Sequence, residues 1–518
     1  MNDSITAYFL EENIYVRIAF LPLILYAFNE NQTNKKQNLS CTIILFLSNL
    51  LANYTRGTMM INKKILTQPV FIFVVSALLI TTGCVQKELI PKNIIFMIAD
   101  GCGYNHVDAA NIYRFGKIGT GIYEKFPVKY GMTTYAVGGE QYNPDSAWTD
   151  FNYVKKKPTD SAASATAMST GVKTYNGAIG VDIDKKPLET IVERAERLGK
   201  ASGVITSVQF NHATPAAFAA HKESRSNYSE IGREMILESQ IDVIMGAGHP
   251  VYDDNGNELT DPDFAAWGGQ ENWQNLTAGR IGGDANGDGT PDLWHFISGR
   301  EEFQALASGD TPIRVFGLAP VKSTLQQKRN GDENADIFSV PLNESAPTLT
   351  EMTLAAINVL DNDPDGFFLM IEGGAVDWAS HDNQSGRMIE EKIDFDQAIE
   401  AVLGWIEAKS NWQETLVMIT GDHETGYLNG PGSGDNAKLA EGGTEAVWVP
   451  LTNNGKGNLP GMEWYSTGHT NQLLPFYAKG AGSRRFVKYA DQTDPVRGKY
   501  IDNGEIGLVM MELWSIDN

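Results

Sequence analysis

The chain has 518 residues, of which 41 are Lys or Arg and 64 are Asp or Glu, so its formal net charge is −23. Hydrophobic residues make up 42% and charged residues 20%, which is typical of a globular protein and argues against a disordered, collagen-like or wholly membrane-embedded chain. So acidic a chain offers no general basic surface to nucleic acid, and its three cysteines neither build a disulfide framework nor form a CxxC zinc pattern.

The first predicted element is a signal peptide at residues 60–83. Basic Lys63 and Lys64 precede an apolar run at 70–80, and small residues precede Cys84. This order resembles a bacterial lipoprotein signal, in which the cysteine is lipidated and becomes the new N-terminus, although Thr81 stands where Leu is usual. Because the run is short for a bilayer span, we favour a cleaved, acylated signal over an uncleaved anchor, a plain secretion signal or an apolar helix within the fold.

Residues 1–59 lie upstream of a signal that works only at an N-terminus. We therefore predict that translation starts at Met59 or Met60 and that 1–59 are not part of the mature protein; the alternative is a membrane hairpin built from the apolar runs 18–28 and 41–51. The mature chain would be residues 84–518, which removes six basic and four acidic residues and leaves a net charge of −25. We expect it to be exported, periplasmic or at the cell surface, and anchored through a lipid on Cys84.

Short apolar runs alternate with helical patterns through the rest of the chain. Strands are predicted at Asn93–Ala99, 204–208, 367–371 and 416–420, and a helix over 188–198 is followed by Gly199 as a stop. This alternation predicts an α/β fold with a large, mainly parallel central sheet and helices on both faces. Residues 246–346 are rich in Asp, Asn and Gly and poor in apolar periodicity, so we expect an inserted subdomain there.

Polar residues follow each of these strands. Ligands bind outside the carboxyl ends of strands in open α/β sheets, and carboxylates crowded there repel one another unless cations lie among them. A single acidic residue would be a routine helix cap, but four strands deliver Asp, Glu, His or Thr to this edge: Asp100, His212 with Thr214, Glu372, and Asp422 with His423.

Residues 159–170 read TDSAASATAMST and are followed by Gly171. The small residues favour a helix from Ser161 that ends at Gly171. Ser161 would then lie at a helix N-terminus, where backbone N–H groups and the helix dipole favour an anion. Taken alone, an Asp160 or Ser161 helix cap is the simpler interpretation.

Residues 372–382 read EGGAVDWASHD, which places Asp377 and His381 four apart, on one face of a helix. Asp with His suits zinc, although a solvated pair is the simpler interpretation of this spacing alone. His469, in STGHTN, is ambiguous by itself.

Taken together, these motifs resemble the alkaline phosphatase family. The strings DSAASATA, HATPAA followed by SRSNY, EGGAVDWASH, GDHETG and TGHTN stand in the family's order and nearly its spacing, and the resemblance covers nearly all of residues 93–479. It implies an alkaline phosphatase-like fold, a homodimer, and hydrolysis of small phosphate monoesters at a site with two Zn²⁺ and one Mg²⁺.

The resemblance also implies a role for each matching residue. Ser161 is the nucleophile that becomes phosphorylated, and Arg225 binds the substrate phosphate with its planar fork. The first zinc would be held by Asp377, His381 and His469, the second by Asp100, Asp422 and His423, and the magnesium by Asp100, Thr214 and Glu372. His212 would lie in the magnesium site or beside it, and Asp160 and Trp378 would lie close to the metal ligands.

The chemistry explains these residue types. A phosphate monoester resists an anionic nucleophile, and two metal ions can activate the serine oxygen, shield the charge and stabilise the leaving alkoxide. Zinc takes oxygen and nitrogen ligands, whereas magnesium prefers oxygen. His212 stands where some members have Asp, and Trp378 where others have Lys or His, so the magnesium site could differ in affinity or accept zinc. Cys102, where Met is frequent, is expected to be packed rather than reactive.

A second metal pattern lies at residues 284–292, DANGDGTPD. Acids or amides at loop positions one, three, five and nine, with Gly at six, match the first part of a calcium loop, but His295 stands where a Glu is expected. The alternative is a polar turn. A structural Ca²⁺ would use Asp284, Asn286, Asp288, the Thr290 carbonyl and Asp292.

Four other functions compete with a phosphomonoesterase. A phosphodiesterase, sulfatase or phosphomutase could use the same metal scaffold, but no cysteine lies in the C-x-P-x-R motif of a sulfatase, and the pair Thr214 and Glu372 is usually absent from diesterases of this superfamily. A metal-bearing binding protein without turnover would have lost its nucleophile, whereas Ser161 is present in its motif.

Overall fold

The structure is a computed structural model that describes residues 89–285, 289–434 and 447–515. The predicted signal at 60–83, the residues before it and the lipidation site Cys84 lie outside the described residues. So do two residues of the predicted calcium loop, Asn286 and Asp288. Those predictions therefore stay predictions.

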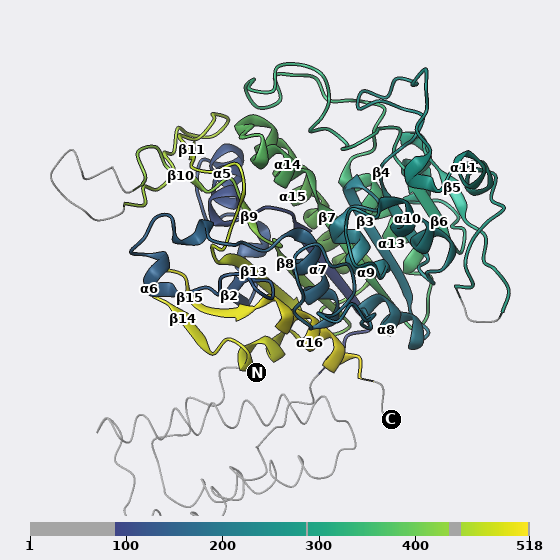
Figure 1. The fold of residues 1–518 in the computed structure, drawn as a ribbon, viewed down its shortest axis with the longest axis horizontal. Helices are drawn as coiled ribbons and strands as arrows, with labels where there is room; N and C mark the ends of the chain where they lie inside the picture. The colour runs from purple at the N-terminus through teal and green to yellow at the C-terminus, as the bar shows by residue number, and fades with distance from the viewer. Residues whose placement is uncertain (1–88, 286–288, 435–446, 516–518) are drawn as a thin grey trace, which may run out of the picture. The chain divides into compact units, whose positions relative to one another are not determined.

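An eleven-stranded sheet runs through the centre of the described chain (Figure 1), in the order β14-β15-β2-β13-β8-β1-β7-β3-β4-β6-β5. From β8 to β5 every strand is parallel to its neighbours, and β15 is parallel to β2. β13 is antiparallel to both β2 and β8, and β14 to β15. The predicted mainly parallel α/β sheet is confirmed. Its strands are β1 (Asn93–Ala99), β2 (Val128–Thr133), β3 (Ala201–Gln209), β4 (Val243–Ala247), β5 (His295–Ile297), β6 (Val315–Leu318), β7 (Phe367–Gly373), β8 (Thr415–Thr420), β13 (Leu474–Gly480), β14 (Gln492–Asp494) and β15 (Gly498–Asp502).

Helices cover both faces of the sheet (Figure 1) because its central strands are apolar on both sides. Along β1, Ile95 and Met97 belong to one hydrophobic cluster and Ile94 and Phe96 to the other. The first cluster includes residues of α5 (Tyr104–Phe115), α12 (Arg300–Leu306), α13 (Leu349–Leu360), α14 (Ala375–His381) and α15 (Ser385–Lys409). The second includes residues of α7 (Ser161–Thr170), α8 (Ile191–Arg197), α9 (Ala213–Ala219), α10 (Tyr228–Leu237), α11 (Gln270–Thr277) and α16 (Asn503–Leu513).

Both helices predicted from capping and periodicity form, and α7 has the expected ends. α7 begins at Ser161, and Asp160 caps it by accepting a hydrogen bond from the backbone N–H of Ala163 at 3.0 Å. It ends at Gly171, whose φ of 80° is a left-handed conformation that favours glycine. α8 spans Ile191–Arg197 and begins three residues later than the predicted start at residue 188, because Thr190 and Glu193 form a capping box at its N-terminus.

Short elements complete the chain around the edge of the sheet. Two small antiparallel pairs, β9 (Glu424–Thr425) with β12 (His469–Thr470) and β10 (Leu428–Asn429) with β11 (Glu463–Trp464), join segments that are distant in sequence. The remaining helical turns are α6 (Pro144–Ala147) and the 3₁₀ turns η2 (Ile122–Lys125), η3 (Tyr153–Lys155), η4 (Ala265–Trp267) and η6 (Ser483–Lys488).

The segment 246–346, expected to be an inserted subdomain, contributes two strands to the main sheet. β6 pairs with β4, and β5 forms the last strand beside β6. Arg314, which is 1% exposed, fixes this edge by donating to the backbone carbonyls of Ile241, Gly283, Asp292 and Ser239. The segment is thus an extension of the central sheet, and its status as an insertion stays a prediction.

Candidate active site

The carboxyl ends of adjacent parallel strands bring the predicted ligands to one edge of the sheet. β8, β1 and β7 are neighbours, and Ile98 of β1 is in register with Thr420 of β8 and Glu372 of β7. Asp100 and Asp422 each lie two residues beyond this level. All three carboxyl side chains are fully buried, so three strands deliver buried acidic groups to one place.

The first cluster joins Asp377, His381 and His469, whose ligand atoms lie within 4.8 Å of one another. Nε2 of His381 is 3.0 Å from Nε2 of His469 and 3.4 Å from Oδ2 of Asp377. Nδ1 of each histidine contacts a backbone carbonyl, that of Thr467 at 2.5 Å and that of Thr159 at 2.9 Å. A carbonyl oxygen only accepts, so each Nδ1 carries the proton and each Nε2 presents a lone pair. Two lone pairs and a carboxylate facing one another fit a cation such as Zn²⁺.

The second cluster surrounds Nε2 of His423. Oγ of Ser161 lies 3.1 Å from this nitrogen, Oδ2 of Asp422 lies 3.2 Å away, and Oδ1 of Asp100 lies 3.3 Å away. Asp100, His423 and Asp377 also meet the geometry of a three-ligand group. Asp377, which the resemblance assigns to the first zinc alone, therefore lies between the two clusters.

Backbone groups hold Asp422 in place. Its Oδ1 accepts hydrogen bonds from the backbone N–H groups of Gly101 at 3.1 Å and His423 at 2.9 Å, which leaves Oδ2 for a cation. Gly101 has a φ of +71°, and a Cβ there would come within 2.8 Å of the Asp377 backbone. Only glycine allows the two chain segments to approach this closely.

Thr425, which the sequence did not single out, links the two clusters. Its hydroxyl donates to Oδ1 of Asp377 at 2.5 Å and lies 3.2 Å from Nδ1 of His423. A hydroxyl has one proton, so the second contact must be one in which Nδ1–H donates to Thr425. Nε2 of His423 therefore presents its lone pair to Ser161. The pairing of Thr425 with His469 between β9 and β12 fixes this arrangement.

A third group of oxygen atoms lies beside Asp100. Both carboxylate oxygens of Asp100, Oε1 of Glu372 and Oγ1 of Thr214 are buried without a hydrogen-bond partner among the residues that the structure describes. Oε2 of Glu372 accepts from the hydroxyl of Thr206, which faces it in register across β3 and β7. An all-oxygen set with unpaired atoms fits Mg²⁺. Thr206 is a second residue that sequence reasoning missed.

Burial and crowding shift the pKa values of these groups. Burial, followed by the neighbouring carboxylates, raises the pKa of Asp100 well above its ordinary value. Burial likewise raises the pKa of Glu372 to about 7 and that of Asp422 to about 6, and it lowers the pKa of the His423 imidazole well below its usual value. Such groups take up cations in exchange for protons.

Arg225 lies beside the N-terminus of α7. Its Nη1 donates to Oδ2 of Asp160 at 3.1 Å, and its Nη2 lies 3.4 Å from Nε2 of His212. Asp160 thus caps the helix of Ser161 with one oxygen and orients the guanidinium with the other. The ring of His212 packs edge-on against Trp378 at 5.6 Å, and burial lowers the pKa of His212 to about 3. Asp160, Arg225, His212 and Trp378 thus form a row of contacts beside the N-terminus of α7.

Cys102 and His221 are titratable residues that lie outside these clusters. Cys102 is buried, and burial raises its pKa to about 12, as expected of a packed rather than reactive thiol. His221 has Nδ1 3.3 Å from Glu234, and Nε2 2.9 Å from the Leu188 carbonyl and 3.6 Å from Glu193. Although burial opposes its charge, these acceptors raise its pKa to about 10. Its surroundings are those of a structural ion pair.

The described part of the predicted calcium loop directs its carboxylates at its own backbone. Oδ2 of Asp284 accepts from the N–H of Gly289 at 2.8 Å, and Oδ2 of Asp292 accepts from the N–H of Ala285 at 2.9 Å. Thr290 is also described. Arg314 binds the carbonyls of Gly283 and Asp292 at the two ends of the loop. Calcium binding here stays a prediction.

Comparison with known proteins agrees with this geometry. The family model described as "Alkaline phosphatase" matches residues 91–457. The chain belongs to the alkaline phosphatase family. It is an enzyme of that family, and the family is one of phosphoric monoester hydrolases, so the predicted enzyme class is confirmed.

Individual relatives cover much of the chain. It is 34% identical to alkaline phosphatase 3 of Bacillus subtilis over 66% of this chain and 62% of that protein. It is 31% identical to alkaline phosphatase of Escherichia coli K12 over 78% of this chain and 84% of that protein. A mutant alkaline phosphatase of the Antarctic bacterium TAB5, solved with Mg bound in its M3 site, matches with a TM-score of 0.56 and 26% identity over 83% of this chain and 100% of that chain. Within the described part of the chain, no helix has the length and hydropathy that a bilayer span needs.

Proposed function

We propose that this chain hydrolyses phosphate monoesters to an alcohol and inorganic phosphate, through a phosphoserine intermediate at Ser161. One observation carries the proposal: Oγ of Ser161 lies 3.1 Å from Nε2 of His423, inside a buried cluster of unpaired carboxylates. Membership of the alkaline phosphatase family supports the reaction class. A serine placed this way serves as a nucleophile once the charge around it is neutralised.

The donor sets support two Zn²⁺ and one Mg²⁺. Asp377, His381 and His469 would hold the first zinc ion, and Asp100, Asp422 and His423 the second. Asp100, Thr214 and Glu372 would hold magnesium. When bound, these ions supply positive charge that lowers the pKa of the serine hydroxyl, shields the phosphate and stabilises the leaving alkoxide.

The protein side chains position the reactants. Ser161 at the first position of α7 attacks phosphorus, and the N–H groups of the first helical turn favour the phosphoryl oxygens. Arg225 binds two phosphate oxygens with its fork, and Asp160 keeps that fork oriented. His212, which accepts from Arg225 through Nε2, holds the other side of the guanidinium.

Hydrolysis of an aryl phosphate monoester, compared with an aryl diester and an aryl sulfate, tests the proposal. The wild type should prefer the monoester, and Ser161→Ala should lose its turnover. Ser169→Ala is a matched control, because Ser169 is buried in the same helix but donates to the Ala217 carbonyl instead. Equal rates for wild type and Ser161→Ala would overturn the nucleophile assignment, and a faster diester or sulfate reaction would favour that reaction instead.

We further propose that the mature chain begins at Cys84, that it is exported and lipid-anchored, and that it forms a homodimer. The signal-like order of residues 60–84 supports export, and the family supports the dimer. Intact mass of protein from its native membrane tests the first point. An acylated mass for residues 84–518 is expected, whereas a mature chain that contains Arg17 would contradict the predicted start.

A further inference from the structure

Glu424 is a buried carboxylate that the proposed reaction does not use. It follows the proposed zinc ligand His423 in the chain, precedes Thr425, and is 2% exposed. Neither of the metal-ligand groups found among the described residues includes it. A carboxylate is costly to bury unless hydrogen-bond donors satisfy its oxygens, so the groups that it contacts indicate its role.

Each oxygen of Glu424 accepts a hydrogen bond from a different segment. Oε2 accepts from the hydroxyl of Thr470, the residue after the proposed zinc ligand His469. Oε1 accepts from the backbone N–H of Leu428 at 3.0 Å. The carboxylate therefore joins β9, on which it lies, to β12 and to the start of β10.

The bond to Thr470 fixes the register of β9 and β12. In this antiparallel pair Thr470 lies opposite Glu424, and His469 lies opposite Thr425. Each strand has only two residues, and so short a pair is marginal without further contacts. The ring centroids of His423 and His469 lie 3.5 Å apart, with planes inclined by 18°. A slip of β12 along β9 would therefore move one zinc cluster relative to the other.

The bond to Leu428 fixes the turn between β9 and β10. Gly426 and Tyr427 have positive φ angles, of 89° and 48°, and Tyr427 is buried. A bulky residue is rare in this left-handed region, which costs about 1–3 kcal/mol. The Gly426 carbonyl accepts from the N–H groups of Tyr465 and Ser466, so this turn also positions the segment that leads into β12.

Glu424 also contacts the segment of a third ligand. Gly103 lies three residues after Asp100, and a Cβ added to Gly103 would lie 2.6 Å from Cγ of Glu424. The two segments therefore approach as closely as a glycine allows. The N–H of the next residue, Thr425, donates to the Gly101 carbonyl at 3.0 Å. Ligand-bearing segments from three parts of the chain thus meet at Glu424.

We propose that Glu424 is a positioning residue of the metal centre. Its carboxylate holds the segments of Asp100, His423 and His469 at the spacing that two zinc ions need, without contacting metal or substrate. Hydrogen bonds to a carboxylate are among the strong ones, and groups behind the metal ligands tune the affinity of a site. This inference rests on the zinc sites of the proposed function and adds to them a residue that is not itself a ligand.

Zinc affinity and the visible absorption of bound Co²⁺ test this role in the purified protein. The absorption depends on the number and geometry of the Co²⁺ ligands, so it reports on positioning rather than on stability alone. Glu424→Met keeps the side-chain length but neither carboxylate acceptor, and Thr470→Val removes the donor of one of its bonds. Each should raise the zinc dissociation constant by about tenfold and change the Co²⁺ spectrum. The double variant should resemble Glu424→Met, because Thr470→Val then removes a bond that is already lost.

Two variants serve as controls. Glu424→Gln should bind zinc nearly as the wild type does, because its amide oxygen can accept from Leu428 and its NH₂ group can donate to the Thr470 hydroxyl. Thr415→Val removes the hydroxyl of a threonine that is as buried as Thr470 but lies at the amino end of β8, where it accepts from Asn93 at 3.3 Å. It should leave the Co²⁺ spectrum unchanged.

The outcomes separate this inference from the proposed function. Wild-type zinc affinity and a wild-type Co²⁺ spectrum in both Glu424→Met and Thr470→Val would overturn the positioning role, and Thr470→Val decides alone if Glu424→Met does not fold. Equal zinc loss in Glu424→Gln and Glu424→Met would also overturn it, because the charge rather than the hydrogen bonds would then matter. If the wild type binds zinc but does not hydrolyse an aryl phosphate monoester, the proposed function fails while the positioning role stands.

Discussion

Replacing Thr425 by Val tests whether the two histidine and carboxylate clusters are metal sites. Val has nearly the shape of Thr but lacks the hydroxyl that bonds Asp377 at 2.5 Å and His423 at 3.2 Å. The substitution leaves a buried carboxylate oxygen and a buried Nδ1–H unpaired. Hydrogen bonds to charged groups contribute about 1.5–3 kcal/mol, and loss of a partner behind a metal ligand weakens metal binding about 10–100-fold.

We therefore expect the zinc dissociation constant of Thr425→Val to rise by about 10–100-fold, measured by competition with a chromophoric chelator and by zinc content after dialysis. Thr425→Ser keeps the hydroxyl and should bind zinc nearly as the wild type does. Far-ultraviolet circular dichroism of each variant checks that the fold is kept. Wild-type zinc affinity in Thr425→Val, or equal loss in Thr425→Ser, would refute the role assigned to the hydroxyl.

Three further predictions concern other parts of the molecule. His221→Gln should lower the urea midpoint of unfolding more at pH 6 than at pH 10. The pKa of His221, raised to about 10, gives stability that is fully present below the unfolded pKa of about 6.5 and is lost as pH rises through 10. Equal losses at the two pH values would contradict this ion pair. Arg225→Lys should raise the inhibition constant of inorganic phosphate about tenfold, because one ammonium cannot bind two oxygens as the fork does; unchanged inhibition would argue against phosphate binding. If loop 284–292 binds calcium, free Ca²⁺ at 100 times its dissociation constant should stabilise the chain by about 2.7 kcal/mol, and melting that a calcium chelator leaves unchanged excludes this role.

The sequence predicted the elements whose signal is local. The strand Asn93–Ala99 is a continuous apolar run that ends in Asp100, and α7 has a capping Asp and a terminal Gly, so their bounds could be stated from residues alone. β5 and β6 were missed because strands of three and four residues are too short to show a period. The antiparallel direction of β13 has no local signal, because direction is decided by pairing.

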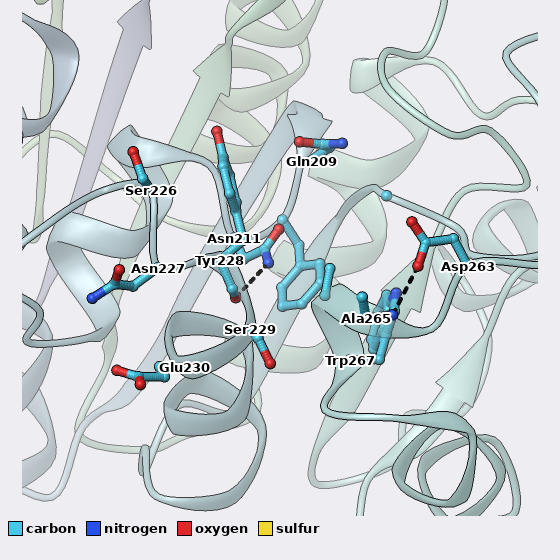
Figure 2. Close-up of a pocket in the computed structure, with 13 residues that line it drawn as sticks. Gln209, Asn211, Ser226, Asn227, Tyr228, Ser229, Glu230, Asp263, Ala265 and Trp267 are labelled. Atoms are coloured by element: carbon cyan, nitrogen blue, oxygen red, sulfur yellow. Dashed lines mark hydrogen bonds between the residues drawn. The ribbon is translucent and has the colours of Figure 1, made fainter.

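Site residues were predictable where their type is unusual for their position. Carboxylates and histidines after apolar strands are conspicuous, whereas a threonine in a strand reads as an ordinary β-former. Thr206 acquires its role only because β3 and β7 pair in the register that places it opposite Glu372, and Thr425 only because β9 pairs with β12. The cavity lined by the end of β3, the start of α10 and the loop around η4 (Figure 2) likewise depends on how these segments pack, which no single segment encodes.

The ligands also determine when in folding a cation can bind. Asp100 lies more than 270 residues before Glu372 and more than 320 before Asp422, and the three come together only when β1 pairs with both β7 and β8. These pairings close very long loops, which are slow to form because their entropy must be lost before any contact is gained. An incompletely folded chain therefore has no complete site, and metal would be acquired only after the sheet has formed.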